Sequence, residues 1–394
     1  MFSIIAGIIL ALVIFSVIVF FHELGHYFFS KIFGVKIEEF GIGMPPRILR
    51  LYKDKSGTEY TLNLLPIGGF VKLKGEEFNK NTIKDKNSLV GRPLWQQMII
   101  ALAGIFMNFL FAAFIISIAF NVGVQPISIN TQFNTITKTK LIPSLDDAVN
   151  LGILKIDGIM LSPVSGSVAE KAGIKEGDIL YKIDDKEIKN PEEMIKIISS
   201  SKKSVNLKIK RKGKILDISL TPIDGKIGSY VGYNVTELKK DFVYKYGFFD
   251  SFKEGVKETY NQSVFTLELL KGFVNRIVSP IKKEREEATK SLGGPIAIGN
   301  LFVNLVNQKV AISIIFLIGA IISINLGVFN LLPIPALDGG RFFIMLINGI
   351  VIFLFGKKVI NEKIESTIHV VGFSLLIVLS VFVAYQDIWR IFTG

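Results

Sequence analysis

The feature that most constrains this chain is a His-Glu-x-x-His motif at the end of its first apolar stretch. Residues 2–21 carry no charged side chain, and the motif HELGH follows at once at positions 22–26. In a helix, residues four apart share a face, so His22 and His26 can offer imidazole nitrogens to one zinc ion. Glu23 can take a proton from a water molecule on that metal as the water attacks a peptide carbonyl. The motif predicts a zinc site for hydrolysis at membrane depth.

The alternative for this motif is a chance match on a helix with two buried histidines. The whole chain has only three histidines, however, and the motif uses two of them. Ionisable clusters inside a membrane are costly and usually functional. The chain has no cysteine, so any metal must be held by His, Asp or Glu. We therefore favour the zinc interpretation, with zinc inferred from the ligand type.

Long apolar stretches predict an α-helical polytopic membrane protein. We expect about four transmembrane helices, at residues 1–30, 96–122, 310–355 (one span and the segment that follows it) and 368–388. The net charge of +12 arises from Lys and Arg beside these spans, without a nucleic-acid-binding motif, so no nucleic-acid partner is expected. The basic loop at 31–95 should be cytoplasmic. The N-terminus lacks a basic region and a cleavage site, which predicts a retained span.

A break in the third span supplies a candidate third metal ligand. The sequence NLLPIPALDGG at 330–340 contains two prolines and two glycines, which free backbone groups that lipid cannot satisfy. The break must therefore face protein or a water-filled cavity. Asp338 is the only carboxylate between residues 310 and 355, and it can complete the site begun by the histidines. The alternative is an Asp that caps a helix at an ordinary kink.

Three further segments have readable patterns. Residues 59–74 alternate apolar and polar side chains around a proline and two glycines, which predicts a hairpin. An unwound substrate can pair with its free edge as an added strand. Alternatively, the hairpin is a structural element on the membrane surface. Gly104 and Asn108 share one face of the second span and predict close helix packing, with the amide bonded inside the bundle. Residues 242–290 predict an amphipathic interfacial helix, for anchoring rather than gating.

The polar region at 125–236 predicts a soluble insert. The order of its elements resembles a circularly permuted PDZ domain at about 150–222, and GSVAEKAGIKEGDIL at 166–180 matches the signature of that domain except for Val168. By this resemblance, the backbone amides of Leu151, Gly152 and Ile153 would form a loop that binds a C-terminal carboxylate. Whether the domain binds a peptide terminus or acts as a steric filter stays open.

These motifs together resemble the site-2 protease family of intramembrane zinc metalloproteases, of the bacterial RseP type (regulator of sigma-E protease). The resemblance covers nearly the whole chain and includes Gly294-Pro295-Ile296. It implies Zn²⁺ bound by His22, His26 and Asp338, with Glu23 as the catalytic base. It also implies that the segment at 59–74 is a membrane-reentrant loop that clamps the substrate. The residues that it assigns to substrate binding are Asn330, Pro333, Gly68 and Gly69.

The expected protein is an endopeptidase of the bacterial cell membrane, with the PDZ domain outside and the active site toward the cytoplasm. The resemblance implies cleavage of single-span membrane proteins already cut by a site-1 protease, such as anti-sigma factors, and of remnant signal peptides. The chain departs from the pattern in having one PDZ module where the best-known members have two, and Ile105 where a proline is common. We assign no role to Arg341, and we expect a packing or headgroup-level role for His369.

Three other functions fit parts of the sequence. A membrane-anchored quality-control peptidase of the heat-shock type also carries HExxH, but it takes a glutamate as third ligand, whereas Asp338 lies within LDG. A metal transporter would carry a repeated half or further polar ligands along a pathway, and the sequence shows neither. A non-catalytic PDZ adaptor would tolerate the loss of Glu23, which is present.

Overall fold

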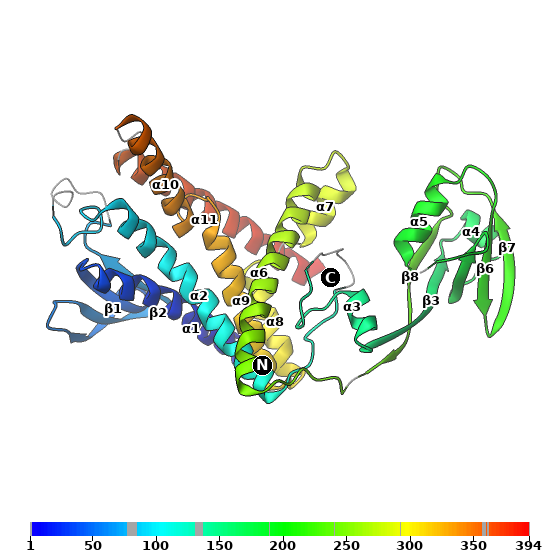
Figure 1. Ribbon diagram of the computed structural model, residues 1–394, viewed down its shortest axis with the longest axis horizontal. Helices are drawn as coiled ribbons and strands as arrows, with labels where there is room; N and C mark the ends of the chain where they lie inside the picture. Colours follow the sequence, from blue (N-terminus) through cyan, green and yellow to red (C-terminus); the bar gives the residue numbers. More distant parts are fainter. Residues whose placement is uncertain are drawn as a thin grey trace. The chain divides into compact units, whose positions relative to one another are not determined.

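The chain forms two units, a helical one and a smaller one built on a sheet (Figure 1). The computed structural model describes residues 2–76, 85–130, 137–188, 190–239, 241–291, 293–356, 360 and 362–393. The predicted segments 31–95 and 125–236 therefore each contain residues outside this description. The first unit comprises residues 1–127, 133–141 and 243–394, and the second comprises residues 128–132 and 142–242.

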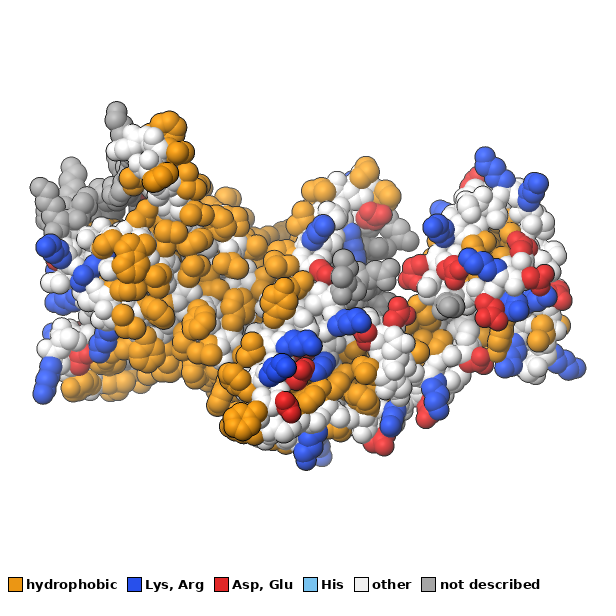
Figure 2. Space-filling model, in the orientation of Figure 1, with side chains coloured by type: hydrophobic (Ala, Val, Ile, Leu, Met, Phe, Trp, Pro, Cys, Tyr) orange, Lys and Arg blue, Asp and Glu red, His pale blue; other side chains and the backbone are white. Residues whose placement is uncertain are grey.

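The helical unit contains five helices that are long and apolar enough to cross a membrane, counted over the described residues. Hydrophobic side chains cover much of its surface in Figure 2. Sequence analysis predicted about four, because it took 310–355 as one span with a following segment. The structure divides this segment into two helices at residues 332–337, where the two prolines lie. The five are α1 (Phe2–Ile32), α2 (Leu94–Val122), α9 (Ile312–Leu331), α10 (Asp338–Phe355) and α11 (Glu362–Thr393). This architecture is that of a multi-pass membrane protein.

Small residues bring these helices close together. A Cβ atom on Gly25, inside the HELGH motif, would lie 2.2 Å from the carbonyl oxygen of Ala103 in α2. A Cβ atom on Gly7 would lie 2.5 Å from Cα of Val303 in α8 (Pro295–Asn307). Lipid gives no hydrophobic drive for helix association, so close backbone approach of this kind is what packs helices in a membrane. The glycine of the motif thus places α1 directly against α2.

A bent antiparallel sheet of two long strands follows α1. The strands are β1 (Ile37–Lys53) and β2 (Glu59–Leu73), and Gly41 of β1 pairs with both Thr61 and Phe70 of β2. The two halves of 59–73 therefore both pair with β1. The predicted hairpin within 59–74 was wrong in this respect, because alternation reveals a strand but not its partner. Strand β2 also contacts α1, where the Ser16 hydroxyl donates to the Pro66 carbonyl at 3.1 Å.

The segment predicted as one amphipathic helix contains two helices, α6 (Phe248–Ile277) and α7 (Lys282–Ser291). Helix α6 packs against both α2 and α9. A Cβ atom on Gly255 would lie 2.1 Å from the Ser117 hydroxyl of α2, so this contact is close. Its N-terminal aromatic residues, Phe248 and Phe249, are exposed. The location of α6 at the membrane surface stays a prediction.

In its described residues, the second unit is an antiparallel sheet with three short helices. The strand order is β7-β6-β4-β3-β8, and β5 pairs with β4. Its core holds Ile159, Leu161, Leu180, Leu207 and Ile209, all fully buried or nearly so. The strands are β3 (Leu154–Pro163), β4 (Asp178–Ile183), β5 (Lys186–Glu187), β6 (Val205–Arg211), β7 (Lys214–Leu220) and β8 (Ser229–Leu238), and the helices are α3 (Leu145–Asn150), α4 (Val168–Lys171) and α5 (Pro191–Ser200).

Candidate metal centre and catalytic cavity

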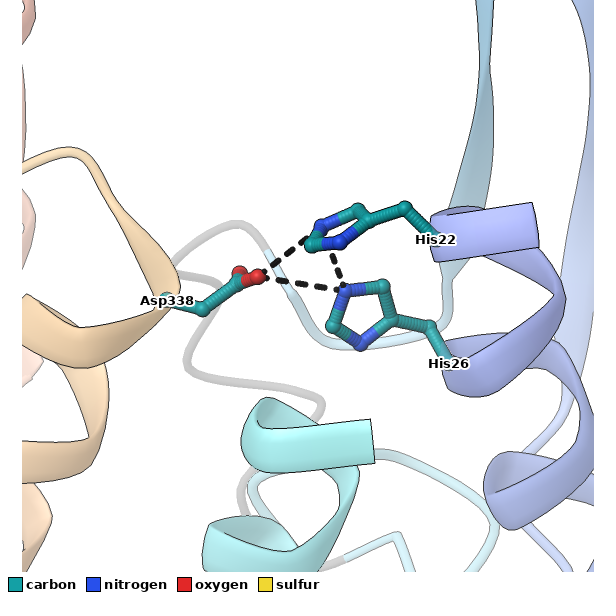
Figure 3. A group of neighbouring side chains, drawn as sticks. All are labelled: His22, His26 and Asp338. Atoms are coloured by element: carbon teal, nitrogen blue, oxygen red, sulfur yellow. Dashed lines mark hydrogen bonds and ion pairs between the residues drawn. The ribbon is translucent and has the colours of Figure 1, made fainter. Parts of the chain in front are cut away.

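Three side chains meet in the helical unit, although more than 300 positions separate one of them from the other two (Figure 3). His22 and His26 project from α1, and the carboxylate of Asp338 points toward both rings from the first residue of α10. Asp338 Oδ2 lies 3.0 Å from His22 Nε2 and 3.4 Å from His26 Nε2. The ligand atoms of all three residues lie within 4.8 Å of one another. The N-cap of α10 is Leu337, so Asp338 does not cap this helix and its side chain is directed to the histidines.

Each histidine ring has a hydrogen-bond partner at Nδ1, and this partner determines that the lone pair of Nε2 is available to a metal. His26 Nδ1 lies 2.8 Å from the Ile100 carbonyl, which can only accept, so Nδ1 carries the proton and Nε2 has a free lone pair. Asn108, fully buried on α2, places its amide 3.2 Å from His22 Nδ1. The Asn108 oxygen finds no partner among the described residues. With the amide turned over, this oxygen accepts from Nδ1–H, and His22 also presents a bare Nε2.

The space between these atoms fits a metal ion. A Cβ atom on Gly104 would lie 2.4 Å from His26 Nε2 and 2.7 Å from His22 Cε1, so only glycine leaves this side of the site open. Asp338 Oδ2 is buried and receives no hydrogen bond from any described residue. Two imidazole lone pairs and a carboxylate oxygen at this separation repel one another unless a cation lies among them. A His₂Asp set of this kind matches a catalytic zinc site with an open fourth position.

The catalytic-base candidate lies one residue along the motif. Glu23 Oε2 accepts a hydrogen bond from the backbone N–H of Val71 in β2 at 3.0 Å. Glu23, the three metal-site residues and the β2 residues Phe70 and Val71 line one cavity of about 480 Å³. The base, the donor atoms and a strand edge therefore share one cavity.

Comparison with known proteins agrees with this geometry. The sequence profile of Peptidase family M50 matches residues 10–379. The chain belongs to peptidase family M50. A Clostridium perfringens protein named "Putative zinc metalloprotease" is 32% identical over 97% of this chain and 98% of its own length, and a Campylobacter jejuni protein of the same name is 30% identical over 95% and 91%. The "Regulator of sigma E protease" of Haemophilus influenzae is 26% identical over 95% of this chain and 97% of its own length.

The four predicted substrate-binding residues of this M50 peptidase are not among the described residues that line the cavity. Gly68 has a left-handed φ of +68° and lies against Val19, while a Cβ atom on Gly69 would lie 2.8 Å from the Gly41 oxygen. Both glycines thus shape the bend of β2 just before its cavity-lining residues. Asn330 lies in the last turn of α9 and Pro333 is exposed in the loop that follows.

Two side chains to which the sequence analysis gave no place in the active site, Arg341 and His369, line the same cavity. Arg341, one turn after Asp338, donates to Glu76 at 2.6 Å and so ties α10 to the segment after β2. His369 of α11 accepts from the backbone N–H of Ala336 at 3.0 Å. In the sequence these two residues stand out only as polar residues beside or within apolar spans. Their partners lie far away along the chain, so the sequence does not reveal the contacts.

The structure does not support the carboxylate-binding loop that the sequence predicted in the second unit. The amides of Leu151, Gly152 and Ile153 donate to carbonyls of α3 at 2.8–2.9 Å. They close the C-terminal end of that helix, and so they are not free to bind a peptide terminus. Strand β8 instead forms an outer strand of the sheet next to α5, as a peptide-binding strand would. Sequence spacing alone could not show that the fold already uses these amides.

Proposed function

We propose that this protein is an intramembrane zinc endopeptidase, which cuts single-span membrane proteins within their transmembrane segments. The observation that carries the proposal is the convergence of His22, His26 and Asp338 beside Glu23, in a cavity among apolar helices. The relatives' names include zinc metalloproteases, and the donor set suits Zn²⁺. Zinc held by these three residues would supply a polarised water molecule and an electrostatic contact for the carbonyl oxygen.

The proton transfers fall to Glu23. Its carboxylate takes a proton from the attacking water and returns it to the leaving amine nitrogen as the peptide bond breaks. The hydrogen bond from Val71 N–H holds one carboxylate oxygen, which leaves the other oxygen for the water.

Substrate binding uses the edge of β2 in this proposal. A transmembrane helix hides its carbonyls in its own hydrogen bonds, so a cleavable segment must first unwind. An extended segment can then pair with the free edge of a strand. Residues 69–73 pair with β1 along one edge, and their other edge lines the cavity at Val71, whose N–H is bonded to Glu23; a substrate strand would therefore pair beside the base with the remaining backbone groups of this edge. The amide of Asn330, in the last turn of α9, is the proposed partner of the exposed substrate backbone, as the family resemblance implies.

The remaining expectations complete the proposed function. The basic loop at 31–95 is cytoplasmic and the sheet unit, a PDZ domain, is extracytoplasmic in the bacterial cell membrane. The proposed substrates are of the anti-sigma-factor type, already cut by a site-1 protease; one relative is named for the regulation of sigma E. In this arrangement the PDZ domain either excludes untrimmed substrates or binds a new C-terminus along β8.

The test is cleavage of a single-span substrate without its outer domain, in liposomes. We expect Glu23→Gln and Asp338→Asn to abolish cutting, while the matched changes Glu176→Gln and Asp224→Asn at exposed positions leave it unchanged. Deletion of the second unit should preserve cleavage of this substrate and extend it to untrimmed ones. Full activity of the Asp338→Asn protein would refute the assigned ligand set.

A further inference from the structure

The loop that delivers Asp338 is held in an unusual conformation by the last helix. Ala336, two residues before Asp338, has a φ of +78°, a left-handed value that residues with a side chain seldom adopt. Its N–H donates to His369 Nδ1 at 3.0 Å. This hydrogen bond from α11 thus stabilises the strained position at which the chain turns into α10.

A second contact lies on the same face of α11. Gly372, three residues after His369, is so close to the loop that a Cβ atom would lie 2.4 Å from Pro335 Cβ and 2.8 Å from the Pro335 oxygen. Those distances leave no room for a side chain. His369 and Gly372 therefore form one surface against which residues 335 and 336 are seated.

The far end of α11 is also anchored. Asp387 is buried and accepts from the N–H groups of Gly294 and Ala297 at the start of α8, at 3.0 and 3.1 Å. Most of the length of α11 is otherwise exposed in the structure. A helix with so few buried side chains is thus fixed by polar contacts at two places, one of which is the loop before Asp338.

We propose that His369 is a positioning residue for the metal centre. It acts through Ala336, and not by contact with the metal, by keeping the loop in the conformation that aims Asp338 at the two histidines. This inference rests on the proposed zinc site. Because Nδ1 accepts a hydrogen bond, the neutral ring carries its proton on Nε2, a buried atom that no described residue contacts by a hydrogen bond. The role of Nδ1 can therefore be separated from that of Nε2.

The experiment compares side chains that keep or lose the acceptor at the Nδ1 position. In His369→Asn the amide oxygen branches from Cγ, as Nδ1 does, whereas His369→Leu has no acceptor. The full-length proteins are purified in detergent, their Zn²⁺ affinity is measured by competition with a chelating dye, and their Co²⁺ absorption spectra are recorded. We expect the zinc Kd to rise about tenfold or more in His369→Leu, as for other supporting residues of metal sites, and to stay within about threefold in His369→Asn. The control is Ser374→Ala, which removes a hydroxyl that donates a hydrogen bond to the Val370 carbonyl within α11.

Glycine variants test the second contact without removing a polar group. Gly372→Ala should weaken Zn²⁺ binding and alter the Co²⁺ spectrum, whereas Gly299→Ala, at a helical position with open space around it, should do neither. The positioning role is overturned if His369→Leu binds Zn²⁺ like the native protein, or if His369→Asn is as weak as His369→Leu. Should Asp338→Asn bind Zn²⁺ undiminished, the metal-site assignment itself fails. If Asp338→Asn loses Zn²⁺ binding while His369→Leu and Gly372→Ala keep it, the metal-site assignment stands and only the role of His369 is overturned.

Discussion

The carboxylate of Glu23 accepts a hydrogen bond from the backbone N–H of Val71 at 3.0 Å, so a strand outside the helical bundle sets the position of the proposed base. The bond joins two segments that lie 48 positions apart. Because it uses a backbone atom, no side-chain pattern reveals it. It makes the geometry of β2 part of the proposed catalytic apparatus as well as part of the proposed substrate site.

Removal of this N–H should slow the reaction without removing the metal. We expect Val71→Pro to lower kcat about tenfold to a hundredfold, since a hydrogen bond to a charged group contributes about 1.5–3 kcal/mol. Proline is tolerated at a strand edge, where its missing N–H breaks no sheet pairing. Val71→Ala keeps the N–H and is the matched control. Equal kcat values for the two variants, at equal zinc content, would contradict a role for this bond.

The Gly104 position should control zinc occupancy. Gly104→Ala places a methyl group 2.4 Å from where His26 Nε2 now lies, so the ring must move out of the site. We expect purified Gly104→Ala to retain less than about a tenth of the native zinc while staying folded, since alanine favours a helix by about 1 kcal/mol over glycine. Metal analysis and circular dichroism measure the two effects. Gly272→Ala, at an open helical position in α6, should keep its zinc; if it loses as much, the effect is not local.

Asn108 should act through the His22 ring. Asn108→Leu removes the partner of Nδ1, and we expect zinc affinity to fall about tenfold to a hundredfold, as is usual for the second partner of a metal-bound histidine. Asn108→Asp restores an acceptor and should bind zinc more tightly than Asn108→Leu. Dye competition gives both constants. Equal affinities for the leucine and aspartate variants would show that Asn108 serves packing alone, the role that its sequence position predicts.

The sheet unit should lose stability in acid through one ion pair. Burial by itself raises the pKa of Asp178, but two hydrogen bonds from Arg211, at 2.6 and 2.7 Å, together with the Lys175 N–H, bring that pKa below its usual value of 3.8. A carboxyl group with a lowered folded-state pKa contributes stability that is present above the unfolded-state pKa and is lost as the pH falls through the folded-state pKa. We therefore expect amide-exchange protection in β4 and β6 of the intact protein to be steady above about pH 4 and to fall below it.

The control for this pH dependence is Asp178→Asn. It removes the titrating group at a cost in stability, and its amide protection should vary less between pH 4 and pH 2 than that of the native protein. If amide protection falls equally below pH 4 in the native protein and in Asp178→Asn, the loss of stability belongs to other carboxyl groups.

The sequence predicted the parts of the site that a local motif defines. The HELGH motif puts His22 and His26 on one helix face with Glu23 one residue along, and Asp338 is identifiable as the proposed third ligand because it is the only carboxylate between residues 310 and 355. Contacts that depend on tertiary packing were not accessible in this way. The Val71 bond uses main-chain atoms, and Asn108 has a pattern that suits packing as well as histidine contact. The Ala336 conformation and its His369 partner depend on how α11 crosses the loop.

Strand pairing shows the same limit. Alternation at residues 59–73 correctly indicated extended structure, but both halves pair with β1, whose sequence is interrupted by two glycines and two prolines. In the second unit, a Leu-Gly-Ile sequence suggested a loop with free amides, whereas the structure uses those amides to end α3. A hydrogen bond from the backbone is decided by the fold around it rather than by its own residue type.

The most direct test of the central claim is to locate the cut and its oxygen atom. A single-span substrate is cleaved in liposomes prepared in ¹⁸O-labelled water, and the products are analysed by mass spectrometry. The account predicts a new C-terminus inside the apolar segment that carries one ¹⁸O atom, formed by the native protein and absent with Glu23→Gln. Cuts confined to the polar flanks of the substrate, or an unchanged product from Glu23→Gln, would contradict it.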